Sequence, residues 1–216
     1  MCRLALVNNA GIKHIEENYG LKNLFDYLER QLGGHGNGVC IIHKDGSYCI
    51  DKGVTLSNNT IAEEILKDID DIKWIIYHTR LASIGMINNQ NCHPFEHNSK
   101  VLAMNGTERQ YKIINRELTD TENILLASDN IRIDTRNYRS VFLGYENGKV
   151  FANKNNGCLK YIPCENGGKI FASNFPIEYY RNDTVYEAPQ IFVEGKKMKC
   201  LELASYYDEY YYMGLR

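Results

Sequence analysis

The chain has 216 residues, of which 44% are hydrophobic and 24% are charged, and its formal net charge is −2. These values are typical of one globular domain with a sizeable core, and the slightly acidic balance argues against a nucleic-acid binder with a broad basic face. The sequence has no apolar run of 18 residues and no signal-peptide core near its start. We therefore expect one domain over residues 1–216, located in the cytoplasm and without a membrane span.

In the first half of the chain, hydrophobic periodicity predicts both strands and helices. Apolar residues at helical spacing predict a helix over residues 21–32, which the glycine-rich run 33–38 ends. Thr60 and Glu63 have the spacing of a capping box, which predicts the start of a second helix at Thr60. The predicted strands of this half are 2–7, 39–43, 48–51 and 73–78.

The second half is richer in strands. A short strand over residues 101–104 ends at Asn105-Gly106, and Thr119 and Glu122 form another capping-box pattern that predicts a helix to Ala127. Strands and helices mix without strict alternation, which indicates an α+β sandwich of antiparallel sheets with helices outside. The other predicted strands are 141–145, 149–152, 169–172, 190–193 and 198–203.

The seven cysteines show neither the spacing of a disulfide framework nor a Cys-x-x-Cys pair. This pattern is typical of a reducing compartment, where cysteines in strands pack as small hydrophobic residues. Cys92 and His93 are adjacent rather than spaced as metal ligands. We expect neither a structural metal nor a cofactor.

Cys2 directly follows the initiator methionine. Because cysteine is small, removal of Met1 is expected, and this would leave a thiol and a free α-amine on one residue. The α-amine has a pKa of about 7.7–8.0, close to the operating pH that suits a general base. Cys2 can therefore supply both nucleophile and base, although a Met-Cys start also occurs by chance.

Three further sites carry polar residues at the ends of predicted elements. Arg80 follows a buried strand and offers a planar fork for a carboxylate, although a surface arginine is the commoner case there. Asn105-Gly106 can form an oxyanion hole or an ordinary hairpin turn. Asp120 can bind an amine, or it can simply favour the start of its helix.

The order of these motifs is more specific than any one of them. It runs from Cys2 through the glycine-rich turn, His78-Thr79-Arg80, Asn91-Cys92-His93-Pro94-Phe95 and Asn105-Gly106 to the capping box at 119–122. This series resembles the glutamine amidohydrolase domain of class II glutamine amidotransferases, which are N-terminal-nucleophile hydrolases. The resemblance covers most of the chain, and residues 172–174 also look like a late hairpin of that family.

The resemblance implies a four-layer αββα sandwich of two antiparallel sheets. It also implies that Cys2 is the nucleophile, that its α-amine is the general base, and that Asn105 and Gly106 hold the oxyanion. Arg80 would pair with the substrate α-carboxylate and Asp120 with its α-ammonium. The implied substrate-binding residues are Gly36, His78, Arg80, Ser83 and Asp120.

The sequence departs from the family pattern at several positions. Met104 stands where the family usually has histidine, and the glycine loop lacks the usual Arg-Gly pair, the nearest arginine being Arg30. Residues 83–85 read Ser-Ile-Gly, and the segment between Asn105 and Asp120 is shorter than in many members. These changes leave the nucleophile and the oxyanion residues in place and bear on substrate identity.

The function that the resemblance implies is hydrolysis of the glutamine side-chain amide, or of a γ-glutamyl amide, to release ammonia. A partner synthase chain would accept the ammonia, and the chain can form a homo-oligomer. The Tyr-rich residues 206–212 suit either a docking surface or a final edge strand. The alternatives are a non-catalytic binding protein and an N-terminal-cysteine amidase for another amide, such as a bile-salt or penicillin amide.

Overall fold

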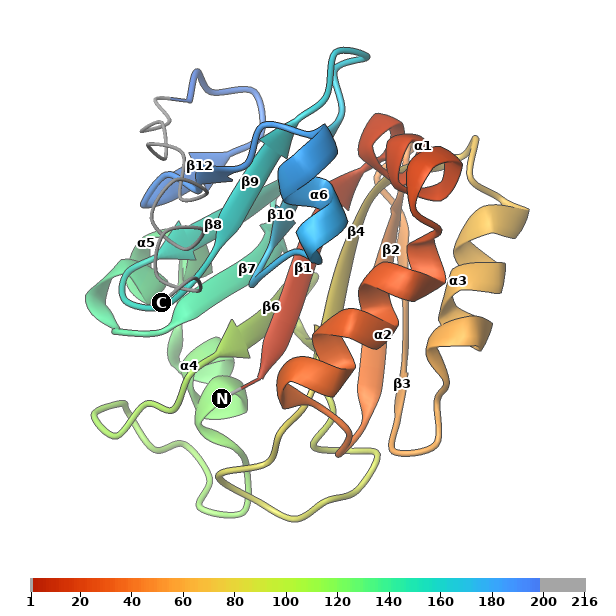
Figure 1. Ribbon diagram of the computed structural model, residues 1–216. Helices are drawn as coiled ribbons and strands as arrows, with labels where there is room; N and C mark the ends of the chain where they lie inside the picture. Colours follow the sequence, from red (N-terminus) through yellow and green to blue (C-terminus); the bar gives the residue numbers. More distant parts are fainter. Residues whose placement is uncertain (1, 199–216) are drawn as a thin grey trace, which may run out of the picture.

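The computed structural model describes residues 2–198, which form two antiparallel sheets between two layers of helices (Figure 1). The larger sheet has the strand order β11-β9-β10-β1-β4-β2-β3, and the smaller has the order β12-β8-β7-β6-β5. The strands are β1 Arg3–Asn8, β2 Asn37–His43, β3 Tyr48–Gly53, β4 Ile72–Thr79, β5 Phe95–His97, β6 Lys100–Asn105, β7 Val141–Glu146, β8 Lys149–Lys154, β9 Lys160–Pro163, β10 Lys169–Ala172, β11 Tyr186–Glu187 and β12 Ile191–Val193. The helices are α1 Asn9–Asn18, α2 Leu21–Leu32, α3 Asn58–Lys67, α4 Asp120–Ala127, α5 Ile131–Asp134, the 3₁₀ turn η1 Thr135–Asn137 and α6 Ile177–Asn182.

The outer face of the larger sheet is covered by helices α1, α2, α3 and α6 (Figure 1). Helix α2 buries Leu21, Leu24, Phe25 and Leu28, which recur every three or four residues and so lie on one face. The Phe25 ring stacks on Tyr77 of β4, with 4.0 Å between the ring centroids. This packing fixes the helix layer against the central strands.

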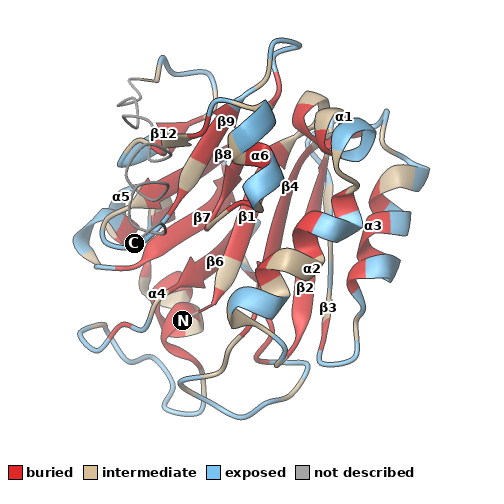
Figure 2. Ribbon diagram, viewed as in Figure 1, coloured by how far each residue is buried: buried red, intermediate tan, exposed pale blue. Residues whose placement is uncertain are grey.

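The two sheets pack face to face. Strand residues alternate between the two faces of a sheet, so Leu4 and Leu6 of β1 point between the sheets while Ala5 and Val7 face the helices. Across the interface, the smaller sheet contributes side chains such as Val101. Figure 2 shows this interior as continuous buried ribbon.

Helices α4 and α5 cover the outer face of the smaller sheet, where Ile124 and Ile131 pack against side chains such as Met104 and Phe142. The four layers are therefore helices, sheet, sheet and helices, and the predicted αββα sandwich is confirmed. Within residues 2–198, no helix is both long and apolar enough to cross a membrane.

Helix ends test the predicted capping boxes. Helix α2 spans the predicted residues, and the box at the start of α4 is present, with Thr119 and Glu122 capping each other's backbone. The predicted start at Thr60 is wrong: α3 begins at Asn58, because the Ser57 side chain accepts the Thr60 N–H and is the N-cap. Beyond its first residue, the predicted strand 198–203 lies outside the described residues, as does the tyrosine run 206–212.

Candidate active site

Four elements bring the predicted catalytic residues to one end of the sandwich. Cys2 precedes β1, Arg80 follows β4, Asn105 ends β6 and Asp120 begins α4. In the β1–β4 ladder Arg3 pairs with Thr79, which places Cys2 beside the first residues after β4. Figure 1 shows the start of β1 at the same end of the molecule as the loops that follow β4 and β6.

Cys2 is held by the backbone of this neighbouring loop. The Leu81 N–H donates to Cys2 Sγ at 3.4 Å, and Sγ lies 3.6 Å from the Leu81 carbonyl oxygen, to which it donates. The residue is only 6% exposed, and burial raises the pKa of its thiol. The thiol is therefore protonated near neutral pH and needs a base before it can act as a nucleophile.

A cation and an anion act on this thiol. The charge of Arg80 favours the Cys2 thiolate, and the charge of Asp120 opposes it. Arg80 is 3% exposed and uses two of its five N–H groups on loop carbonyls, those of Ile84 at 2.7 Å and Met86 at 2.8 Å. Its remaining donors can bind a carboxylate.

Asp120 is also buried, and its carboxylate is fixed by two backbone donors. Glu108 N–H donates to Oδ2 at 2.9 Å and Thr121 N–H donates to Oδ1 at 3.0 Å. Burial is the largest influence and raises the pKa of the carboxyl group. A cationic amine placed beside it would favour the ionised form.

Asn105 is linked to the start of β1 through Ser173, which follows β10. Asn105 Nδ2 donates to Ser173 Oγ at 3.4 Å, and the same hydroxyl accepts the Leu4 N–H at 3.0 Å. One Nδ2 hydrogen remains free for an oxyanion, and the buried Asn105 Oδ1 has no partner within the described chain. Ser173 thus ties the predicted oxyanion donor to the strand that carries Cys2.

Gly106 has φ +152°, a conformation that side chains other than glycine rarely adopt. A Cβ at this position would lie 2.0 Å from Ser140 Oγ. The residue must therefore be glycine for the chain to turn here, and its half-buried backbone directly follows Asn105. The need for glycine is thus structural, and the oxyanion role of Asn105 and Gly106 stays a prediction.

Gly36 belongs to a loop that pairs with the segment after β4. Arg80 N–H donates to the Gly36 carbonyl at 2.8 Å, and His35 N–H donates to the Arg80 carbonyl at 2.9 Å. His35 Nδ1 also accepts the Ala82 N–H at 3.0 Å. The glycine-rich loop therefore braces the backbone around Arg80, and the sequence did not point to His35 in this role.

His78 lies beneath the site rather than at its surface. It has no exposed surface, and its Nε2 donates to the Met104 carbonyl at 3.1 Å, next to Asn105. Its ring centroid is 4.1 Å from that of His93, whose Nε2 lies 2.9 Å from Thr121 Oγ1, beside Asp120. Burial lowers the pKa of both histidines, that of His78 to about 3. The two neutral histidines therefore contact Met104 and Thr121, the chain neighbours of Asn105 and Asp120.

Ser83 lies on the exposed side, where its hydroxyl is 2.8 Å from that of Thr107. This contact joins the loop after β4 to the loop after β6. Within residues 2–198, no group of three or more histidine, cysteine, aspartate or glutamate residues could hold a metal ion. The arrangement is thus a buried thiol with a cation and an anion near it, at the same end of the sandwich as Asn105 and Gly106.

The sequence of this chain is similar to that of a known protein. No known protein-family profile matches it. A Saccharomyces cerevisiae protein described as "Probable glutamine amidotransferase DUG3" is 30% identical over 100 residues, which is 41% of this chain and 26% of the yeast protein.

Two solved structures have the same fold. The allosteric regulatory enzyme of purine biosynthesis superposes with a TM-score of 0.60 at 17% identity, over 93% of this chain and 49% of that one. The glutamine phosphoribosylpyrophosphate amidotransferase of B. subtilis superposes with a TM-score of 0.53 at 15% identity, over 94% of this chain and 49% of that one. This chain thus spans about half the length of these enzymes and a quarter of the yeast protein. The predicted resemblance to glutamine amidotransferases is confirmed, and the chain has the fold of these two enzymes.

Proposed function

We propose that this protein hydrolyses the side-chain amide of glutamine, or a γ-glutamyl amide, with Cys2 as an N-terminal nucleophile after removal of Met1. The observation that carries the proposal is a buried thiol under the opposed charges of Arg80 and Asp120. A free amino acid has one carboxylate and one ammonium group, so its pocket needs both complements. The likeness to glutamine amidotransferases supports the same substrate class.

The raised pKa of the Cys2 thiol makes a neighbouring base necessary. In the proposed reaction the Cys2 α-amine takes the thiol proton while Sγ attacks the amide carbon. Asn105 and Gly106 donate to the resulting oxyanion, where one donor is worth about 10²–10³ in rate. The proton passes to the leaving nitrogen, ammonia departs and a thioester remains. Water, deprotonated by the same amine, then attacks the thioester, which releases glutamate and restores the thiol.

The substrate carboxylate would bind the free N–H groups of Arg80, and the substrate ammonium would bind Asp120. A partner chain or further domain would accept the ammonia, since this chain spans only half of the enzymes that it resembles. The reaction requires no metal or cofactor. We place it in the cytoplasm, where a cysteine nucleophile stays reduced.

A glutaminase assay on the untagged protein tests this proposal. Cys2→Ala removes the nucleophile and should abolish glutamate release, with the circular dichroism spectrum and unfolding midpoint retained. Cys49→Ala, which removes an exposed cysteine from β3, is the matched control and should keep wild-type activity. Glutamate release by Cys2→Ala at the wild-type rate would contradict the mechanism.

A further inference from the structure

A cavity lies next to the loop that follows β6, close to the candidate active site. Its volume is about 450 Å³. Two chain segments line it, one directly after Gly106 and one that runs from the last residue of η1 toward β7. The lining residues are Thr107, Glu108, Arg109, Gln110, Asn137, Tyr138 and Arg139.

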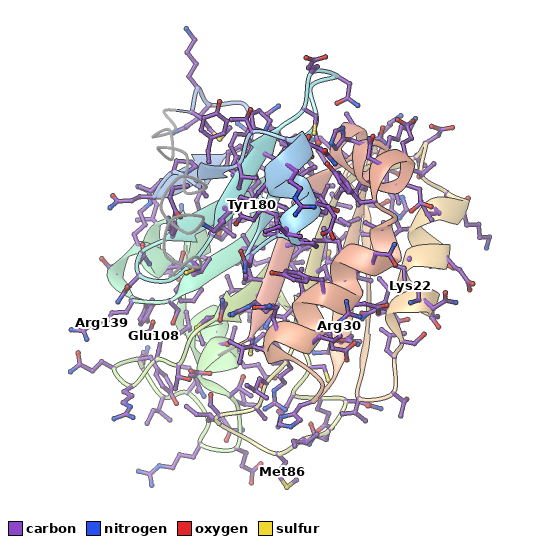
Figure 3. The ribbon with its side chains drawn as sticks, in the orientation of Figure 1. Lys22, Arg30, Met86, Glu108, Arg139 and Tyr180 are labelled. Atoms are coloured by element: carbon purple, nitrogen blue, oxygen red, sulfur yellow. The ribbon has the colours of Figure 1, made fainter. Side chains whose placement is uncertain are left out.

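A buried carboxylate holds the two segments together. Glu108 is 6% exposed, and its Oε1 accepts the Arg139 N–H at 2.8 Å, the Ser140 N–H at 2.7 Å and the Ser140 hydroxyl at 2.6 Å. Charge-assisted hydrogen bonds of this kind are short and strong. The cavity wall is therefore fixed, and Figure 3 shows Glu108 and Arg139 at the same edge of the molecule.

The cavity carries an excess of positive charge. Arg109 and Arg139 both line it, and neither guanidinium has a hydrogen bond or ion pair with any other residue among 2–198. Glu108 contributes the one carboxylate of the lining, and three protein donors already share its Oε1. Both arginines are exposed, and together with the Glu108 carboxylate they give the lining residues a formal net charge of about +1.

We propose that this cavity is a binding site for a small anion that carries a carboxylate or phosphate group. Arg109 and Arg139 would bind the anion from two sides, since the guanidinium fork suits both groups. Gln110, Asn137 and Tyr138 also line the cavity, and their amide and hydroxyl groups could bind hydroxyl groups of the same ligand.

The cavity shares its wall with the candidate active site. The Glu108 N–H donates to Asp120 Oδ2, and Ser140, which Glu108 holds, packs against Gly106. A bound anion would therefore contact the segments that fix Asp120 and Gly106. The site is nevertheless separate from the amino-acid pocket and does not need Cys2.

Isothermal titration calorimetry on the full chain tests the site, with inorganic phosphate and succinate as probes at constant ionic strength. The double variant Arg109→Gln/Arg139→Gln removes both guanidinium groups. Arg181→Gln, at an exposed position of helix α6, removes one positive charge elsewhere and is the control for loss of charge. Cys2→Ala is titrated as well, so that binding is measured independently of the proposed hydrolysis.

We expect saturable binding of phosphate, succinate or both, and the better probe identifies the anion class. The double variant should bind at least about tenfold more weakly, because each charge-assisted contact is worth that much or more. Arg181→Gln and Cys2→Ala should bind as the wild type does. Absence of saturable heat with both probes, or unchanged affinity in the double variant, would overturn the proposal.

Discussion

Burial of a neutral His78 beneath the site should make the protein sensitive to acid. Its pKa is lowered from 6.5 to about 3 in the folded chain, chiefly because burial disfavours the charged ring. The folded pKa lies below the unfolded value. At any pH between the two pKa values, the unfolded chain therefore binds more protons at His78 than the folded chain does. The stability is therefore intact above pH 6.5 and falls progressively as the pH drops toward 3.

The magnitude follows from the same two values. At pH 5, which is 1.5 units below the unfolded pKa of 6.5, the unfolded ring is almost fully protonated while the folded ring is neutral. At about 1.36 kcal/mol per unit, His78 alone should cost about 2 kcal/mol of unfolding free energy between pH 8 and pH 5. His78→Gln keeps an N–H donor for the Met104 carbonyl and cannot titrate.

Urea unfolding followed by fluorescence of Trp74 at pH 8 and pH 5 measures this difference. The wild type should lose about 2 kcal/mol more than His78→Gln on acidification. Ile76→Val, a buried change on the same strand, should cost about 0.5–1.5 kcal/mol at both pH values, which controls for destabilisation alone. Equal losses in the wild type and His78→Gln would refute the argument that His78 is buried without its proton.

Three further substitutions test the site. Gly106→Ala should lower kcat by about 10²-fold or more in the glutaminase assay and also lower the melting temperature, because its Cβ would meet Ser140 Oγ at 2.0 Å; wild-type turnover would contradict the oxyanion role. Arg80→Lys should raise KM for glutamine about tenfold with a smaller change in kcat, because a point charge replaces a bidentate fork, and an unchanged KM would remove Arg80 from the substrate pocket. Ser173→Ala should lower kcat about tenfold with KM retained, because Asn105 loses its hydrogen-bond partner; a change confined to KM would argue against this positioning role.

Much of the fold could be predicted because its main elements carry strong local signals. The apolar face of α2 and the reciprocal caps of Thr119 and Glu122 define two helices without help from the rest of the chain. Helix α1 was not predicted, because Asn8, Asn9 and Gly11 resemble a turn. Asn8 caps the helix, since its side chain accepts the Gly11 N–H, and Ile12 and Ile15 pack the helix on the sheet.

Part of the candidate site could likewise be predicted from the sequence, and part could not. Chain order was enough to indicate Cys2, Arg80 and Asp120, and the charges of Arg80 and Asp120 both act on the Cys2 thiol. The supporting contacts of Ser173 and Glu108 depend on segments that meet only in three dimensions, so no local pattern could show them. The sequence also could not show that His78 has no exposed surface, because burial of a residue near the end of a strand depends on the layer packed above it.

The central claim is that Cys2 is an N-terminal nucleophile in a glutamine-shaped pocket. Its most direct test is the intact mass of the untagged protein before and after treatment with the glutamine analogue 6-diazo-5-oxo-norleucine, with peptide mapping. We predict loss of Met1 and one adduct on Cys2, with the exposed Cys49 and Cys158 unmodified and with protection by glutamine. A retained Met1 with no adduct on Cys2 would contradict the proposed mechanism.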